Sequence, residues 1–232
     1  ALPTFSTQVA QNRLTEMRAS LSATLRGILL LSVPASLGLV LLRVPIVTLL
    51  YQRGEFTAYS TKLVAWALLW YAIGLVGHAM VEILARAFYA LHDTKTPVFI
   101  GIGAMSLNVL FSYLFSAWFT RLSWMPHGGL ALANSLATGL EMVGLLLIMR
   151  KRLNGMDGKR IWGGVLKFAI AAVLMGIAIW GWINLTGASS AWVLAGGGIL
   201  TGLVIYLFSL WLLKCSELNQ FAQVIKSRLT QP

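Results

Sequence analysis

Three ionisable side chains stand four residues apart in one apolar stretch of the sequence: His78, Glu82 and Arg86. At this spacing they lie on one face of a helix, where a glutamate can pair with an arginine one turn later. An ionisable group inside a long apolar helix forms a buried pair or lines a polar cavity. Two interpretations follow: Arg86 pairs with Glu82 near the aqueous boundary as a structural element, or the three side chains line a cavity or gate.

Two more charged residues in apolar stretches are candidates for the same cavity or gate. Arg26 stands near the start of the first stretch, and Glu141 stands in a later one with no basic residue three or four positions away. An isolated carboxyl group of this kind is protonated, faces water, or pairs with a different helix. We expect Glu141 to take one of these three states.

Uncharged polar side chains form a second group of candidates. Asn108 and Ser112 are four residues apart in one apolar stretch, and Asn134, Ser135 and Thr138 lie in the next. On two adjacent antiparallel helices they could form a small cation site, because hard cations prefer oxygen ligands. The alternative is hydrogen bonding between helices, worth about 1 kcal/mol or less per contact. No metal site is assigned beyond this group, and no catalytic triad or carboxylate pair is present, so we expect no enzyme.

The elements that carry these residues are long apolar helices. Of 232 residues, 58% are hydrophobic and 11% charged, whereas roughly a quarter of residues are charged in soluble globular domains. A helix of about 20 apolar residues crosses a bilayer. The sequence therefore predicts an all-α integral membrane protein with six transmembrane helices. The expected spans are residues 22–42, 63–91, 98–120, 128–149, 165–183 and 191–213.

Three features between or within these spans need an interpretation. Pro34 lies inside the first span and should kink it, because proline removes one backbone hydrogen bond. Residues 44–51 are too short to span and are either the tail of a long tilted helix or an interfacial segment. Residues 1–21 are polar, with an amphipathic pattern that fits a helix on the membrane surface or a loop. Cys215 has no cysteine partner within the chain.

The net charge of +11 is distributed in short segments between the apolar stretches. This distribution sets membrane orientation, so we expect no nucleic-acid partner. Only Arg43, Arg53, Lys62 and Arg121 fall on one side of the six spans, and the other fourteen of the 18 Lys and Arg residues, including Lys226 and Arg228, fall on the opposite side. The positive-inside rule therefore predicts that both ends of the chain are cytoplasmic.

Three sequence segments occur in a characteristic order: ALPTFS at residues 1–6, YQRGEFT at residues 51–57 and ARAFYALHDTKTP at residues 85–97. Together they resemble the second half of the MurJ/MviN family, the bacterial flippases for the lipid-linked peptidoglycan precursor lipid II. The resemblance covers at least residues 1–152, and the last two spans match by position and hydropathy. Asp93 and Thr94, within the third segment, are expected to cap the next helix.

The resemblance implies a flippase of fourteen helices, with two six-helix bundles followed by two extra helices. The six spans would be the ninth to fourteenth helices. Residues 1–21 would form a cytoplasmic connector, residues 22–152 four helices of the second bundle, and residues 153–232 the two additional helices and a cytoplasmic tail. The chain would then be the C-terminal part of a multi-pass protein of the bacterial cytoplasmic (inner) membrane.

The implied function is movement of lipid II from the cytoplasmic to the periplasmic leaflet by alternating access, for cell-wall synthesis. The implied partners are the undecaprenyl-linked precursor, membrane lipids and the N-terminal helices of the same protein. A central cationic cavity would receive the headgroup, and the last two helices would border a lateral groove for the lipid tail. The family arginines most closely tied to the headgroup lie upstream of Ala1.

No cofactor is implied, but ion coupling is. Some family members have a sodium site between their seventh, eleventh and twelfth helices. Asn108 falls on one ligand position of the eleventh helix, Ser112 stands where those members have an acidic residue, and Asn134 or a neighbour matches the twelfth. A sodium ion or the membrane potential is therefore the expected source of coupling.

Three alternatives remain open at this stage. A flippase for another polyprenyl-linked glycan, such as an O-antigen or capsule unit, would share the architecture. A drug/cation antiporter of the same superfamily would show ion-linked drug efflux. A membrane scaffold for cell-wall enzymes would tolerate substitutions in the cavity but not on the surface.

Overall fold

The computed structural model describes residues 2–156, 158–187 and 190–215, and these residues are helical apart from short connections. Six segments are long and apolar enough to cross a membrane, which confirms the prediction of an all-α protein with six spans. The elements are α1 (Leu2–Ala10), α2 (Leu14–Tyr51), α3 (Ala58–Ala90), α4 (Lys95–Arg121), α5 (His127–Arg152), α6 (Gly158–Thr186), a π-helix η1 (Val193–Gly197) and α7 (Gly198–Leu212).

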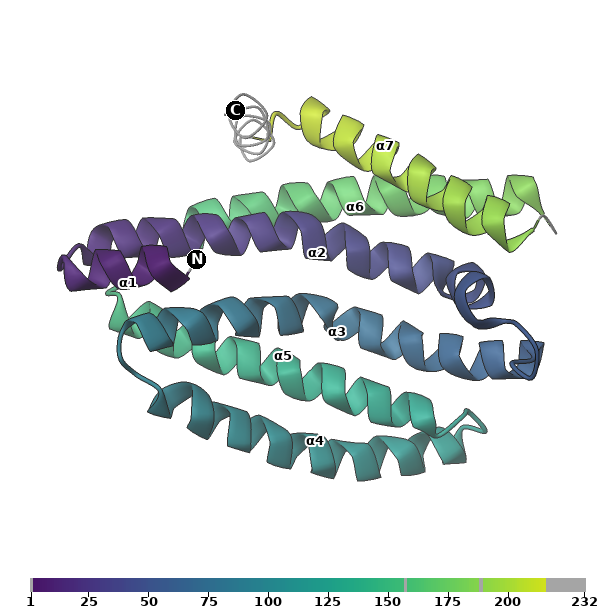
Figure 1. Ribbon diagram of the computed structural model, residues 1–232, viewed down its shortest axis with the longest axis horizontal. Coiled ribbons are helices and arrows are strands. Elements are labelled where there is room, and N and C mark those ends of the chain that lie inside the picture. Colours follow the sequence, from purple (N-terminus) through teal and green to yellow (C-terminus); the bar gives the residue numbers. More distant parts are fainter. Residues whose placement is uncertain (1, 157, 188–189, 216–232) are drawn as a thin grey trace.

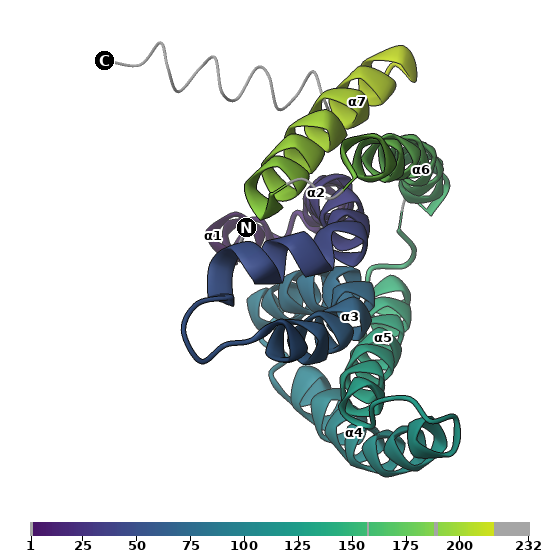
Figure 2. The same cartoon turned by 90° about the vertical axis from the view of Figure 1, so that its right-hand side faces the viewer.

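The first span is longer than its apolar stretch. Helix α2 begins at Leu14 instead of residue 22 and continues through Pro34 and Pro45 to Tyr51. Residues 44–51 are therefore the tail of this helix, and Figure 2 shows that tail turned away from the preceding part. The connector predicted for residues 1–21 contains α1 and the first eight residues of α2. Phe5 of α1 is buried against the long helices.

The long helices lie in two groups on opposite sides of α2. Helix α3 packs on one side of α2, and α5 lies between α3 and α4; α6 packs on the other side and carries α7 (Figures 1 and 2). The turns after α3 and α5 lie at the same end as α1, and the turns after α2 and α4 lie at the opposite end (Figure 1). Cys215, just after α7, is buried and forms no disulfide.

Small residues set the close approach of α3, α4 and α5. A Cβ on Gly77 of α3 would lie 3.6 Å from the Cα of Gly139 on α5, so these backbones are in contact. A Cβ on Gly129 of α5 would lie 2.6 Å from the backbone of Phe115 on α4. Apolar side chains gain little from leaving lipid, so membrane helices associate through such close packing.

The sixth span contains an irregularity that its hydropathy does not reveal. It begins as η1, a π-helix, and continues as α7. Gly197 lies directly against the indole of Trp182 on α6, and Trp182 Nε1 donates a hydrogen bond to the carbonyl of Val193 at 3.2 Å. The widened turn thus accommodates a large aromatic side chain of the neighbouring helix. The predicted cytoplasmic tail, with Lys226 and Arg228, lies outside the described residues.

Candidate functional site

The row His78, Glu82 and Arg86 divides into two separate interactions. Arg86 donates a hydrogen bond to Glu82 on the same helix, which confirms the predicted pair. His78 is exposed and turns toward α5, where its Nε2 lies 3.1 Å from Nδ2 of Asn134. The sequence predicted the first contact from helical spacing, but the second joins residues 56 positions apart.

Glu141 lies on α5, seven residues after Asn134. Its Oε1 is 3.5 Å from the point that a Cβ on Gly101 of α4 would occupy. Glu141 is half-buried, and its carboxyl group extends toward α4, so the choice among the three states stays a prediction.

The residues of the predicted cation site take part in two different hydrogen bonds. On α4, Ser112 Oγ donates to Asn108 Oδ1 at 3.3 Å, whereas Asn134 of α5 contacts His78. Within the described part of the chain, no hydrogen bond joins the α4 pair to Asn134, and no group of three His, Cys, Asp or Glu side chains could hold a metal ion. The sodium site stays a prediction.

Arg26 lies away from the polar face of α3 and α5, which His78, Glu82 and Asn134 form. It lies on the side of α2 that packs against α6, with its Cδ 3.4 Å from the point that a Cβ on Gly164 would occupy. The sequence placed Arg26 near the start of the first apolar stretch, and its position around the α2 axis directs the side chain toward the other group of helices. Arg26 therefore lies at the α2–α6 interface, and its place in the cavity or gate stays a prediction.

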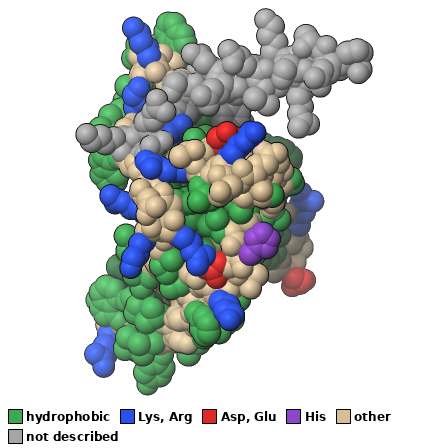
Figure 3. Space-filling view, turned by 90° about the vertical axis from the view of Figure 1, so that its left-hand side faces the viewer, with side chains coloured by type: hydrophobic (Ala, Val, Ile, Leu, Met, Phe, Trp, Pro, Cys, Tyr) green, Lys and Arg blue, Asp and Glu red, His purple; other side chains and the backbone are tan. Residues whose placement is uncertain are grey.

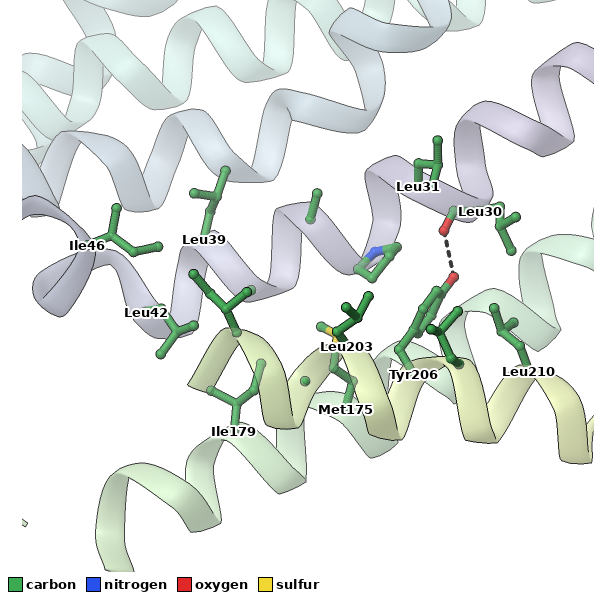
Figure 4. A pocket seen from close by; sticks show the side chains of 16 residues that line it. Leu30, Leu31, Leu39, Leu42, Ile46, Met175, Ile179, Leu203, Tyr206 and Leu210 are labelled. Carbon is green, nitrogen blue, oxygen red and sulfur yellow. Dashed lines mark hydrogen bonds between the residues drawn. The ribbon is translucent and has the colours of Figure 1, made fainter. Parts of the chain in front are cut away.

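A long apolar groove lies on the same side of α2, between α2, α6 and α7 (Figure 4). Its volume is about 710 Å³. Gly38 leaves open space in its wall, because a Cβ there would meet no atom within 4 Å. The lining residues are Leu30, Leu31, Pro34, Ala35, Gly38, Leu39, Leu42, Ile46, Met175, Ile179, Ile199, Gly202, Leu203, Tyr206, Leu207 and Leu210.

One hydrogen bond fixes the wall of this groove. Pro34 has no N–H to donate to the carbonyl of Leu30, four residues earlier. The hydroxyl of Tyr206, from α7, donates to that carbonyl at 2.7 Å (Figure 4). The proline thus frees a backbone acceptor that ties α7 to α2. The sequence predicted the freed carbonyl but gave no signal for its partner.

A polar contact also connects the turn between α3 and α4 to the end of α5. Asp93 accepts hydrogen bonds from the N–H of Thr96 at 3.0 Å and from its hydroxyl at 2.6 Å, and it forms an ion pair with Arg152. Asp93 is thus the capping side chain, whereas Thr94 makes no capping bond. The Thr96 hydroxyl and N–H, followed by the positive charge of Arg152, hold the pKa of Asp93 below its ordinary value.

These features define a multi-pass, all-helical membrane protein with a lateral apolar groove and a separate polar helix face. A family model described as "Lipid II flippase MurJ" matches residues 1–212. The chain belongs to this family, which confirms the resemblance seen in its three sequence segments. Such family members are multi-pass proteins of the bacterial inner membrane.

Individual relatives agree with this assignment. Over 160 residues the chain is 36% identical to the probable lipid II flippase MurJ of Vibrio cholerae, covering 67% of this chain and 29% of that protein. Over 137 residues it is 38% identical to the lipid II flippase MurJ of Burkholderia cenocepacia, covering 59% and 25%. The chain thus matches less than a third of the length of these relatives.

A solved structure shares the fold. The lipid II flippase MurJ in an inward closed conformation superposes with a TM-score of 0.74 at 22% sequence identity. The match covers 90% of this chain and 41% of the solved chain. At this identity the likeness establishes the arrangement of the helices.

Proposed function

We propose that the chain is the C-terminal part of a flippase that moves lipid II from the cytoplasmic to the periplasmic leaflet. The apolar groove between α2, α6 and α7 is the observation that carries the proposal within this family. We assign the groove to the polyprenyl tail of the substrate. We assign the headgroup to a central cavity that the polar face of α3 and α5 forms together with the upstream helices of the same protein. Flipping breaks no covalent bond, so the proposed activity is transport.

The chemistry of the groove suits a hydrocarbon chain. Its lining is almost entirely aliphatic, and the one phenol hydroxyl, on Tyr206, already donates to the Leu30 carbonyl. Lipid tails are as apolar as leucine, so the groove gains little from the hydrophobic effect when a tail leaves the bilayer. Affinity for the tail must come from shape complementarity, through many weak van der Waals contacts along the groove.

The polar face of α3 and α5 suits the side of a central cavity. His78 and Glu82 are exposed in this chain, although both stand on a membrane-spanning helix. Ionisable groups at membrane depth face a bundle interior or a water-filled cavity. We assign this face to the side that meets the other helices of the full-length protein, where rocking of the two bundles would open it to each leaflet in turn.

We place both ends of the chain in the cytoplasm. The end of the molecule that carries α1 and the turns after α3 and α5 gathers many Lys and Arg side chains (Figure 3). This agrees with the positive-inside rule. The lipid-linked substrate would then enter from the end that holds the Asp93–Arg152 contact.

The proposal is tested by filling the groove in the full-length protein. Gly38→Leu adds an isobutyl group at a position in the wall where a Cβ meets no atom within 4 Å. Gly163→Leu, on exposed open surface of α6, is the matched control. We expect Gly163→Leu to support growth when the native flippase is depleted and Gly38→Leu to fail. Growth supported equally by both variants would argue against a tail groove.

A flippase for a different polyprenyl-linked glycan is a second candidate, because the groove would contact only the lipid tail and would not distinguish one sugar headgroup from another. Depletion of the full-length protein separates the two. Accumulation of lipid II on the cytoplasmic side supports the main proposal. Accumulation of another lipid-linked glycan, with normal lipid II turnover, favours the second.

A further inference from the structure

The apolar groove has two distinct ends. Leu30 and Leu210 line one end, which we call the inner end, and Leu42 and Ile179 line the other (Figure 4). The inner end lies nearer the end of the molecule that carries α1 (Figure 1). In the proposed orientation, the inner end therefore faces the cytoplasmic surface of the membrane.

Two lysines lie beyond the inner end of the groove. Lys214 is exposed and stands four positions, about one helical turn, after Leu210. Lys167 of α6 is half-buried, and its Nζ lies 3.5 Å from the carbonyl oxygen of Lys214. In the part of the chain that the structure describes, neither lysine forms an ion pair with a carboxylate. Helices α6 and α7 themselves carry no acidic residue. Two positive charges thus stand where the apolar groove ends.

Tryptophans on the same two helices indicate the depth of these lysines in the membrane. Trp162 of α6 stands five positions before Lys167, Trp211 of α7 stands three positions before Lys214, and both indoles are exposed. Tryptophan is enriched at the interface between membrane and water, where long lysine side chains also extend toward the headgroups. We therefore expect the ammonium groups of Lys167 and Lys214 to lie at the level of the lipid phosphates.

An apolar groove that ends at two ammonium groups suits a lipid with one tail and two phosphates. Lysine binds phosphate as a compact point charge. A polyprenyl diphosphate brings one chain to the groove and two adjacent phosphates to the two lysines. A glycerophospholipid brings two chains and one phosphate, so one chain would stay outside the groove. The shape and charge of the site therefore favour the polyprenyl diphosphate.

We propose that Lys167 and Lys214 form a loading site, which holds the diphosphate of the polyprenyl-linked substrate while the tail enters the groove. The headgroup then moves from the loading site into the central cavity, and the tail stays in the groove. The proposal rests on the proposed function, because it names the position from which that substrate is taken up.

Lys167 also has a structural contact, since its ammonium group donates to a carbonyl at the end of α7. A basic side chain at the C-terminus of a helix is favourable without any ligand. Two substitutions separate this role from phosphate binding. Lys167→Gln keeps an N–H donor for the carbonyl and removes the charge, and Lys167→Arg keeps both the donor and the charge. Melting temperatures of the variants report on the helix contact, and affinity for phosphate reports on the loading site.

The test measures binding of labelled undecaprenyl diphosphate to the full-length protein in phosphatidylcholine nanodiscs. Labelled undecaprenol, which has the same tail and no phosphate, is the uncharged probe. We expect Lys167→Gln and Lys214→Gln each to weaken diphosphate binding about fivefold, as for one basic residue lost near a membrane surface. Undecaprenol binding should stay unchanged, and Lys167→Arg should bind both probes as the wild type does. Unchanged diphosphate affinity in the Lys167→Gln/Lys214→Gln double variant would overturn the proposal.

Lys151→Gln is the matched control. Lys151 is exposed in the last turn of α5, at the same end of the molecule but in the other group of helices (Figure 1). Its substitution should leave diphosphate affinity unchanged, and an equal loss there would show an effect of general surface charge and overturn the assignment. A small fraction of phosphatidylglycerol in the nanodiscs should preserve the difference between wild type and double variant. If that difference disappears, the lysines hold the phospholipid, and the assignment to the substrate is wrong.

Transport of lipid II in proteoliposomes separates this proposal from the proposed function. The double variant should reach the wild-type maximal rate, but only at a higher lipid II concentration. A lower maximal rate with unchanged half-saturating concentration would overturn the loading role and leave the flippase in place. If wild-type protein does not move lipid II, the proposed function is wrong, and the binding of undecaprenyl diphosphate still decides whether Lys167 and Lys214 hold a diphosphate.

Discussion

Pro34 and Tyr206 act together through one backbone carbonyl. The proline leaves the Leu30 oxygen without its helical donor, and the buried phenol of Tyr206 supplies a substitute from α7. Proline residues inside membrane helices are tolerated when neighbouring groups satisfy the freed backbone in this way. This single bond holds the wall of the apolar groove between α2 and α7.

Tyr206→Phe should destabilise the full-length protein by about 1–3 kcal/mol, because it leaves a buried carbonyl without a donor. Pro34→Ala restores an N–H four residues after Leu30. In that background the same Tyr206→Phe change should therefore cost much less. Thermal unfolding of the four proteins in one double-mutant cycle measures the difference. Equal costs in both backgrounds would show that the Tyr206 hydroxyl does not replace the missing donor.

Asp93 contributes to the free energy of unfolding by an amount that depends on pH. Its pKa is lower in the folded protein than in the unfolded chain, so it stabilises the fold fully above its unfolded value of about 3.9. That contribution is lost as the pH falls through the lower, folded value. Wild-type protein should therefore unfold at a higher temperature than Asp93→Asn at pH 7, and the gap should close in strong acid. A gap that persists at pH 2 would contradict this account.

At the residue scale, the sequence predicted contacts within one helix better than contacts between helices. Glu82 and Arg86 are four positions apart, and spacing alone pairs them. His78 with Asn134 and Asp93 with Arg152 are 56 and 59 positions apart, and they meet only because α3 and α5 lie side by side. The orientation of α2 about its own axis, which apolar composition does not encode, also places Arg26 on the side that faces α6.

At the scale of helices, close packing of α4 on α5 depends on a missing side chain at Gly129. Gly129→Ala would place a Cβ 2.6 Å from the Phe115 backbone, which cannot rotate away as a side chain can. We expect a loss of about 1–3 kcal/mol, typical of overpacking. Gly103→Ala on α4 meets open space and should leave the melting temperature unchanged or raise it. Equal melting temperatures for the two variants would mean that the helices separate without cost.

The sequence predicted the number of membrane-spanning helices, but it did not predict where each helix begins and ends. All six apolar stretches became helices, because a spanning segment must satisfy its own backbone. Helix α2 extends back to Leu14, since its first turns are polar and hydropathy does not register them. The π-helix at Val193–Gly197 depends on the fit of Gly197 to Trp182 of another helix, so local sequence did not predict it.

At the scale of the whole molecule, the fold places turns alternately at two ends. Single cysteines at Glu55 and at Lys95, in full-length protein in intact cells, should react with a membrane-impermeant thiol reagent only at position 55. The native Cys215 is buried and should give little background. Labelling of both positions, or of position 95 alone, would contradict the proposed orientation.

The groove and the polar face lie in different groups of helices, on the two sides of α2. This separation suits a substrate with a long apolar tail and a polar headgroup, since each part would contact its own surface. The resemblance over at least residues 1–152 predicted the family, and the apolar stretches predicted the six-helix membrane fold. The groove was predicted only as a property implied by the family, because its sixteen lining residues come from α2, α6 and α7 and meet only in the folded chain.

Direct measurement of lipid II movement by the purified full-length protein tests the central claim. Labelled lipid II in proteoliposomes is followed by its accessibility to a membrane-impermeant quencher. We predict rapid movement with wild-type protein and Gly163→Leu, and at least roughly tenfold slower movement with Gly38→Leu, a change in barrier of about 1.4 kcal/mol. Movement that is no faster than in protein-free vesicles, or that is unaffected by Gly38→Leu, would contradict the account.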